Sequence, residues 1–190
     1  MWVRRVLGGA AALACAALLS ACSLLPGGPD DPKTRANVEM GRIVDAVNHH
    51  DADALKKLFS KSARAKAVGL DGGVKALLSA FPSGITSWDE IQDSPGEIVE
   101  NHYGKQTLLL EGYIKVHANG KVCELDFVDF AVNQIEDPNN VGLYAIAVAP
   151  YSTNPYTPSG AKKPLSAWMS QFGITHGKAT GDPGVFISQK

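Results

Sequence analysis

Residues 107–130 contain the clearest structural signal in the chain, TLLLEGYIKVHANGKVCELDFVDF. Apolar and polar residues alternate on both sides of Asn119-Gly120, and alternation with a period of two is typical of β-strands. The Asn-Gly dipeptide favours a two-residue type I′ turn, because both of its residues tolerate a positive φ angle. The stretch therefore predicts an antiparallel hairpin with its tip at Asn119-Gly120. The predicted partners on its apolar face are Ala118 and Lys121, Val116 and Cys123, Ile114 and Leu125, and Gly112 and Phe127.

The other face of this hairpin supports the same register. There Lys115 lies opposite Glu124, and opposite charges that face each other directly stabilise a strand pair. The remaining predicted partners on this face are His117 and Val122, Tyr113 and Asp126, and Glu111 and Val128. Because the register puts Cys123 on the apolar face, we expect its thiol to be buried and chemically inert.

Asp129 is the first residue that interrupts the apolar face of the hairpin. If the register continues unchanged, Asp129 lies on that face beside Leu110, where a carboxylate is costly unless it is paired or reaches a pocket. Alternatively, a β-bulge near Val128 turns Asp129 outward and Phe130 inward. The sequence leaves both arrangements open.

The residues before the hairpin indicate a helical region. Asp31-Pro32 is typical of a helix start, with Asp31 as the N-cap and Pro32 at the first helical position. Apolar residues at helical spacing follow, and this stripe ends at Asn48-His49-His50. The stripe consists of Ala36, Met40, Ile43, Val44 and Val47. Further helices are predicted to start at Asp51, at Ser60 or Ser62, and at Asp71, with Leu55, Leu58, Phe59, Val74, Leu77, Leu78 and Phe81 as their apolar residues.

From Ile85 onward the pattern changes to that of β-strands separated by turns. The predicted strands are Ile85–Ile91, Glu97–Tyr103, Thr107–His117, Lys121–Val132 and Gly142–Ala149. We expect Pro150–Pro164 to be irregular, Leu165–Phe172 to form a short helix and Val185–Ile187 to form a last short strand. Helices followed by a meandering antiparallel sheet predict the α+β class.

The N-terminus has the pattern of an export signal. Arg4-Arg5 precedes an uncharged apolar stretch, Val6–Leu19, whose fourteen residues suit a signal peptide better than a membrane span. Leu19-Ser20-Ala21-Cys22 follows, and it resembles the lipobox of bacterial lipoproteins. This resemblance implies that Cys22 receives a diacylglycerol and that Met1–Ala21 is removed. The alternatives are an ordinary secretory signal with a chance cysteine and a short anchor helix.

These signals divide the chain into three parts. Residues 1–21 are the predicted signal peptide, and residues 22–30 are the lipidated cysteine and a flexible tether that contains Pro and Gly. Residues 31–190 are predicted to form a single α+β domain, of which 150–190 is an irregular C-terminal extension. The expected location is the cell membrane, with the domain lipid-anchored on the extracytoplasmic side.

The net charge and the motifs that the sequence lacks exclude several classes of function. The 190 residues include 18 Lys and Arg against 19 Asp and Glu, a formal net charge of −1 that argues against a nucleic-acid binder. The sequence lacks Ser-His-Asp, Cys-His and phosphate-loop motifs, so we expect no cofactor. His49-His50-Asp51 and Asp53 have the composition of a metal site. However, adjacent helical residues point about 100° apart and both aspartates suit helix caps, so we expect no metal.

Two resemblances connect these elements with known families. Residues 48–60, NHHDADALKKLFS, are similar to the opening of nuclear-transport-factor-2-like, or SnoaL-like, domains, in which a curved sheet wraps three helices to form a cone with a pocket. A closer resemblance is to a family of bacterial lipoproteins, the domain-of-unknown-function 5104 family. It rests on the lipobox, the helical opening, Gly112-Tyr113-Ile114-Lys115-Val116 and Asp137–Val148. It implies N-terminal helices packed in the concave face of a curved, mostly antiparallel sheet, and it implies no reaction.

The candidate site residues follow from the expected cone. Its wall is mainly apolar, since the predicted concave face carries Leu110, Ile114, Val116, Leu125 and Phe127. Four polar residues could line the pocket or supply acid and base groups to it, and these are Asp129, Tyr113, Asp126 and His102.

The sequence supports two function classes. A membrane-tethered binding module would hold a small hydrophobic or amphipathic ligand or an envelope protein, with a homodimer formed through the sheet as a further option. An isomerase or dehydratase would use a carboxylate in the cone. A single ionisable group in an apolar cavity is more typical of a binding site than of an acid–base site, which needs a second polar group. We therefore expect a non-catalytic binding or interaction module.

Overall fold

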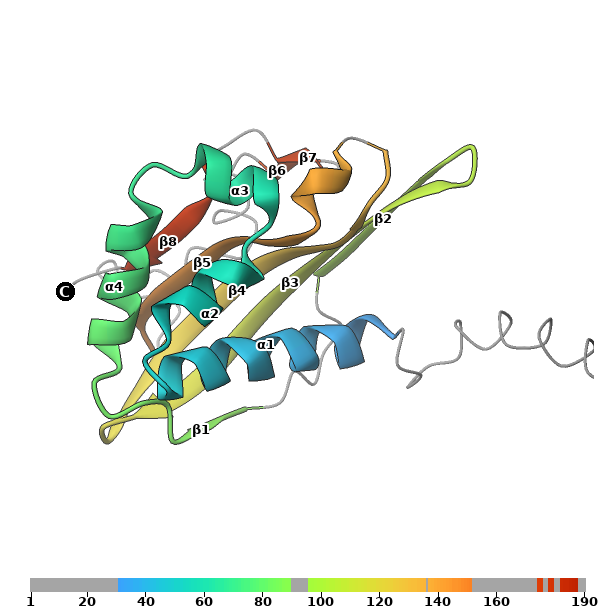
Figure 1. The fold of residues 1–190 in the computed structure, drawn as a ribbon. Coiled ribbons are helices and arrows are strands. Elements are labelled where there is room, and N and C mark those ends of the chain that lie inside the picture. The colour runs from blue at the N-terminus through green and yellow to red at the C-terminus, as the bar shows by residue number, and fades with distance from the viewer. Residues whose placement is uncertain are drawn as a thin grey trace, which may run out of the picture.

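The structure is a computed structural model that describes residues 31–89, 96–135, 137–151, 174–175, 178–179 and 182–187. Most helices precede the strands, and the predicted α+β class is confirmed (Figure 1). The helices are α1 (Pro32–Asn48), α2 (Ala52–Leu58), α3 (Lys61–Lys66), α4 (Leu70–Ala80) and the short 3-10 helix η1 (Pro138–Asn140). The strands are β1 (Ser87–Trp88), β2 (Gly96–His102), β3 (Lys105–Ala118), β4 (Lys121–Asn133), β5 (Gly142–Pro150), β6 (Ile174–Thr175), β7 (Lys178–Ala179) and β8 (Gly184–Ile187).

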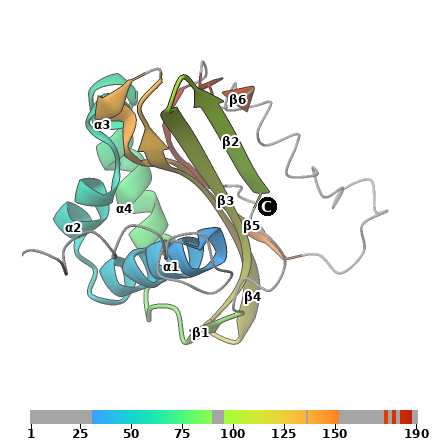
Figure 2. The same ribbon diagram turned by 90° about the vertical axis from the view of Figure 1, so that its right-hand side faces the viewer.

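One mostly antiparallel sheet of six strands organises the described part of the chain. Its order is β1-β3-β4-β5-β8, and β2 pairs with the start of β3 while β1 pairs with its end. β5 and β8 run parallel, whereas the other pairs in this sheet are antiparallel. The sheet curves around α1 and α4, which lie on its concave side (Figure 2).

Apolar side chains of the helices meet the concave face of the sheet in the main core. Its largest members are Met40, Ile43, Leu55, Phe59, Leu77, Phe81, Ile114, Leu125 and Phe127, which are all at most 2% exposed. A second cluster, distinct from this core, contains Leu109, Val128, Phe130, Tyr144, Ala145 and Ala147. The predicted stripe of α1 and the apolar face of the hairpin therefore pack against each other, as expected for residues that share one core.

Three of the predicted helix caps are confirmed. The side chain of Asp31 accepts a hydrogen bond from the Thr34 backbone N–H at 3.1 Å, and that of Asp51 accepts one from Ala54 at 2.8 Å. Ser60 is the cap of α3 and also donates its hydroxyl proton to Oδ1 of Asn140, which ties this helix to η1. Each cap supplies an acceptor to an N–H group that has no partner within its helix.

The predicted cap at Asp71 is wrong. α4 begins at Leu70, one residue earlier, and its N-cap is Gly69, which adopts a left-handed conformation with φ of 77°. Because Gly69 makes this turn without a side-chain cap, Asp71 falls in the first turn of the helix. Its carboxylate instead lies 3.2 Å from Nζ of Lys56 on α2.

The register of the central hairpin is confirmed for each predicted partner from Ala118/Lys121 to Glu111/Val128. Asn119 and Gly120 have φ angles of 52° and 71°, as a type I′ turn requires. Cys123 lies on the core side but is only partly buried, because it pairs with Pro150 at the very end of β5. Burial raises the pKa of its thiol.

Asp129 keeps the unchanged register, and the alternative with a bulge at Val128 is wrong. Leu110 pairs with Asp129 directly, and the pairing of β3 with β4 shifts only beyond Leu109. The irregularity falls instead on β5, where Val128 pairs with Ala145 and Asp129 with Leu143. The extra residue in β5, Tyr144, packs edge to face against Phe130 in the second cluster, with ring centroids 5.9 Å apart.

The remaining predicted strands agree with the structure where it describes them. Gly96–His102, Gly142–Pro150 and Gly184–Ile187 form strands close to the predicted bounds. The strand predicted for Ile85–Ile91 is shorter, since only Ser87–Trp88 pairs with β3 in the described residues. The predictions for most of Pro150–Pro164 and for Leu165–Phe172 lie outside the described residues.

Candidate functional site

Asp129 is a buried carboxylate on the concave side of the sheet, facing α1. It is 7% exposed, as is Glu39 on the helix. None of the described residues forms a hydrogen bond or an ion pair with the Asp129 carboxylate. Burial, and to a smaller extent the negative charge of Glu39, raise the pKa of Asp129 to about 7. A carboxyl group with this pKa can take up or release a proton near neutral pH.

Two arginines on α1 lie near this carboxylate pair. Nη1 of Arg42 lies 3.1 Å from Oε2 of Glu39, and Arg35 is four residues before Glu39 on the same side of the helix. Burial raises the pKa of Glu39, although the Arg42 guanidinium opposes this. Arg42 and Arg35 both lower the pKa of Asp129, but less than burial raises it. The cluster therefore combines two carboxylates that repel each other with cations that partly neutralise them.

The four candidate residues from the sequence do not meet at one point. Tyr113 pairs with Asp126 across β3 and β4, three positions along β4 from Asp129. Successive side chains in a strand point to opposite faces, so Asp126 and Asp129 lie on opposite faces of the sheet. His102 is the last residue of β2, at the tip of the β2–β3 hairpin. Asp129 is thus the one candidate that lies between the sheet and α1.

Sequence reasoning missed the burial of three carboxylates, Glu39, Glu111 and Glu124. Glu39 directly precedes Met40, which is a residue of the apolar stripe of α1. This position beside the stripe was the signal in the sequence that could have indicated the burial of Glu39. Glu111 is 6% exposed, and burial raises its pKa to about 7. The sequence identified Glu111 only as the partner of Val128. Alternation of apolar and polar residues did not show that the second face of the hairpin is also buried.

A groove of about 500 Å³ opens between α2 and α4 on the outside of the helices. Its lining combines apolar residues such as Leu78 and Pro82 with the cationic residues Lys56 and Lys75. The groove is lined by His50, Ala52, Lys56, Asp71, Val74, Lys75, Leu78, Ser79 and Pro82. A volume of this size falls within the range of small-molecule sites, about 300–1,000 Å³.

The two lysines on the groove differ in their partners. Nζ of Lys56 lies 3.0 Å from Asp53 and 3.2 Å from Asp71, and these hydrogen bonds raise its pKa. Lys75 is exposed and forms no ion pair within the described part of the chain. A smaller hollow adjoins the groove, shares Lys56 and Asp71 with it, and adds Arg64. Lys75 is therefore the cation available to an anionic ligand.

The described residues contain neither a cluster of metal-ligating side chains nor a helix suited to cross a membrane. No group of three or more His, Cys, Asp or Glu side chains is arranged to hold a metal ion there. Within the same ranges, no helix combines the length and the apolar character that a membrane span needs.

The sequence of this chain is similar to that of a family of known proteins. No curated protein matches it in sequence. The family model described as Domain of unknown function (DUF5104) matches residues 42–153, which run from the second half of α1 to just beyond β5. The match covers more than half of the sequence and contains Asp129, the groove and the central hairpin, so the chain belongs to the DUF5104 family.

Proposed function

We propose that this protein is a lipid-anchored, extracytoplasmic binding module of the bacterial envelope. The anchor is Cys22, since Leu19-Ser20-Ala21-Cys22 ends a short apolar segment that is preceded by two arginines. Residues 23–30 contain Pro26-Gly27-Gly28-Pro29, which suits a flexible tether between the anchor and the domain that starts with α1. The curved sheet around α1 and α4 supports the further proposal of a nuclear-transport-factor-2-like fold (Figure 2).

The α2–α4 groove is the observation that carries the binding proposal. The concave face that would line a cone is filled by its own side chains, of which Met40, Leu125 and Phe127 are at most 1% exposed. The groove offers apolar surface from Leu78 and Pro82 beside the ammonium group of Lys75, which forms no ion pair within the described residues. Such a surface suits a small amphipathic molecule with a negative head group, because the chain buries apolar area while the head meets a cation.

An isomerase or dehydratase is the second candidate, and Asp129 favours it. A base that works near neutral pH needs a pKa near 7, and burial gives Asp129 such a value. Glu39 and Arg42 supply the second polar group that the sequence alone did not reveal. This candidate requires a substrate to reach the space between β4 and α1. The α2–α4 groove does not provide this access, because no residue of β4 or α1 lines it.

The anchor is tested by replacing Cys22 with alanine in a bacterial host. The wild type is expected to lose Met1–Ala21 and to gain the mass of acyl chains, whereas C22A keeps its leader and incorporates no labelled palmitate. Intact-mass spectrometry of the membrane fraction measures both changes. Cys15→Ala is the matched control, because it removes a thiol from the leader and should leave processing unchanged. A wild type with the same unprocessed, unlipidated form as C22A would refute the anchor.

The groove is tested by an NMR titration with decanoate, an amphipathic anion. Shifts are expected for residues 52–56 and 71–82. Lys75→Glu should weaken binding by at least about fivefold, because it removes a favourable charge contact of about 1 kcal/mol and adds repulsion. Lys121→Glu makes the same charge change at the hairpin tip and should leave the affinity intact. Equal losses in both variants would contradict a site at the groove. Shifts centred on Leu110 and Asp129 would favour the enzyme instead.

A further inference from the structure

The protein contains two hairpin tips with the same local sequence pattern but different first residues. The β2–β3 tip is Tyr103-Gly104 followed by Lys105, and the β3–β4 tip is Asn119-Gly120 followed by Lys121. Their backbones are alike, since Tyr103 and Asn119 both have a φ angle of 52° and each is followed by a glycine with positive φ. The two tips therefore form a matched pair within one molecule.

Tyrosine is a costly choice for this backbone position. Asparagine tolerates the left-handed region, which makes Asn-Gly the usual sequence of such turns, whereas a bulky side chain there is strained. Tyr103 is also fully exposed, with a relative accessibility of 106%, so its ring gains no packing within the fold that would offset this strain. Strain of this kind concentrates at positions that have a function other than stability.

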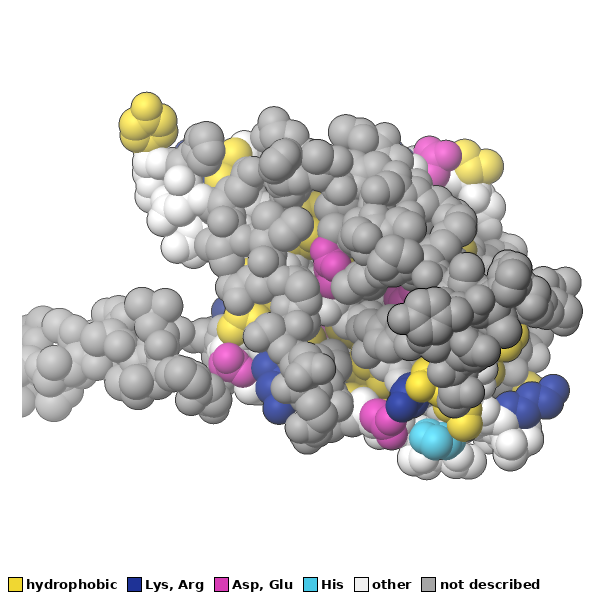
Figure 3. All heavy atoms as spheres, turned by 180° about the vertical axis from the view of Figure 1, so that it is seen from behind, with side chains coloured by type: hydrophobic (Ala, Val, Ile, Leu, Met, Phe, Trp, Pro, Cys, Tyr) yellow, Lys and Arg dark blue, Asp and Glu magenta, His cyan; other side chains and the backbone are white. Residues whose placement is uncertain are grey.

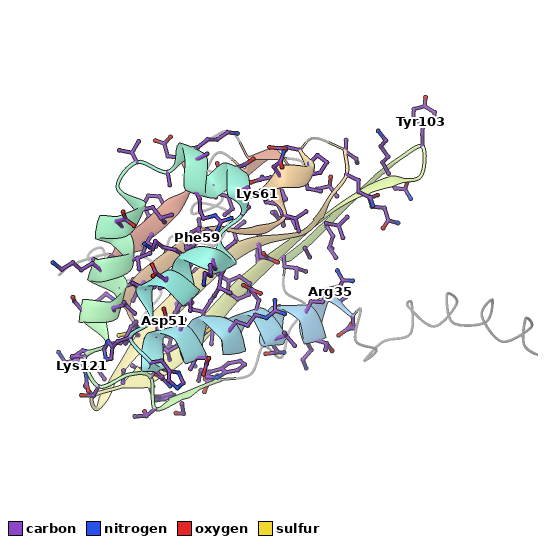
Figure 4. The ribbon with its side chains drawn as sticks, in the orientation of Figure 1. Arg35, Asp51, Phe59, Lys61, Tyr103 and Lys121 are labelled. Carbon is purple, nitrogen blue, oxygen red and sulfur yellow. The ribbon has the colours of Figure 1, made fainter. Side chains whose placement is uncertain are left out.

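The β2–β3 tip extends beyond the rest of the sheet. The pairing of β3 with β4 ends at Thr107 and Asn133, so residues 101–105 continue without a β4 partner. Tyr103 projects at the same end of the molecule as Arg35 in the first turns of α1, while Lys121 beside the other tip lies at the opposite end (Figure 4). From behind, the tip stands clear of the domain and carries a hydrophobic side chain (Figure 3).

We propose that Tyr103 docks into the interfacial region of the lipid bilayer that holds the chain. This inference rests on the proposed anchor at Cys22. The nine residues from there to Asp31 span at most about 30 Å, which keeps the start of α1, and with it this end of the domain, near the bilayer. A tyrosine ring has an apolar body and a polar tip, and such rings concentrate at the level of lipid head groups. Docking at Tyr103 gives the tethered domain a second attachment and a fixed orientation.

The test uses the full-length, lipidated protein in vesicles of phosphatidylcholine and phosphatidylglycerol. In a Cys123→Ser background, a nitroxide is attached to Lys105→Cys or, as the matched control, to Lys121→Cys. Collisions with oxygen and with a water-soluble nickel chelate are measured by electron paramagnetic resonance. We expect position 105 to gain oxygen contact and to lose nickel contact relative to position 121. Tyr103→Asn should abolish this difference while raising the midpoint of thermal unfolding, because asparagine fits the turn.

The other outcomes separate this inference from the proposed anchor. Equal nickel contact at both positions, in protein that floats with the vesicles, overturns the docking and leaves the anchor intact. Protein that does not float with the vesicles overturns the anchor and the docking together. Protection of position 105 in native membranes but not in pure lipid vesicles assigns the tip to a protein partner and overturns docking to lipid.

Discussion

The free energy of unfolding is expected to fall by about 4 kcal/mol between pH 4 and pH 7 because of Asp129, and Asp129→Asn should remove this fall. Burial first, and the charge of Glu39 second, raise the pKa of this carboxyl from 3.8 to about 7. Below pH 4 the group is protonated in both the folded and the unfolded protein, and its stabilising effect is fully present. Between pH 4 and pH 7 the unfolded state releases the proton and the folded state keeps it, so stability declines by about 1.4 kcal/mol per pH unit. Above pH 7 the loss is complete.

Urea unfolding at a series of pH values measures this effect. Asp129→Asn should be more stable than the wild type at pH 8 and similar to it at pH 4. Asp53→Asn is the control, because it makes the same chemical change at an exposed position of α2. Glu39→Gln should reduce the effect in part, since it removes the negative charge that faces Asp129. An unaltered pH profile in Asp129→Asn would show that Asp129 has the same pKa in the folded and the unfolded protein.

Glu111 adds to the decline in the same pH range. Burial raises its pKa to about 7 as well, so its ionisation opposes folding with the same sign. Glu111→Gln combined with Asp129→Asn should therefore give a flatter profile than either variant alone.

Gly112→Ala is expected to destabilise the protein by about 3 kcal/mol, the upper end of the cost of overpacking a core. A Cβ atom at residue 112 would fall within the space of the Phe127 ring, 2.7 Å from its Cδ1, 2.6 Å from its Cζ and closest to its Cε1. Phe127 is 1% exposed and belongs to the main core, so neighbouring side chains would have to shift for its ring to turn away. The Phe127 ring therefore fits against β3 only because residue 112 has no side chain.

A second glycine provides the control for this variant. Gly41 lies in α1 with nothing within 4 Å of the position of a Cβ atom, so Gly41→Ala should stabilise by about 0.5–1 kcal/mol through helix propensity. Phe127→Leu in the Gly112→Ala background should cost less than the two single changes together, because the smaller side chain relieves the clash. Strictly additive free energies of unfolding would rule out the steric contact as the cause.

The sequence predicted the local features of this fold because their causes lie within a few residues. Asn119-Gly120 specified both the turn and the register of the strands beside it, and the partners of Gly112 and Tyr113 followed by counting. The caps at Asp31 and Asp51 were equally local. Asp71 was misassigned although its signal was local, since Gly69 in its left-handed conformation provided a competing start for the helix.

The face and the surroundings of Asp129 were decided only by the tertiary structure. Whether β4 bulged depended on β5, which follows it in the chain and takes the extra residue at Tyr144. The approach of Glu39 depended on how α1 lies across the sheet, because the two carboxylates are ninety residues apart. The parallel pairing of β8 with β5 and the groove between α2 and α4 have the same origin. Turn chemistry and the alternation of apolar residues depend on neighbours in the sequence. The contacts between distant elements depend instead on apolar burial summed over the whole core, and no single stretch of residues determines that sum.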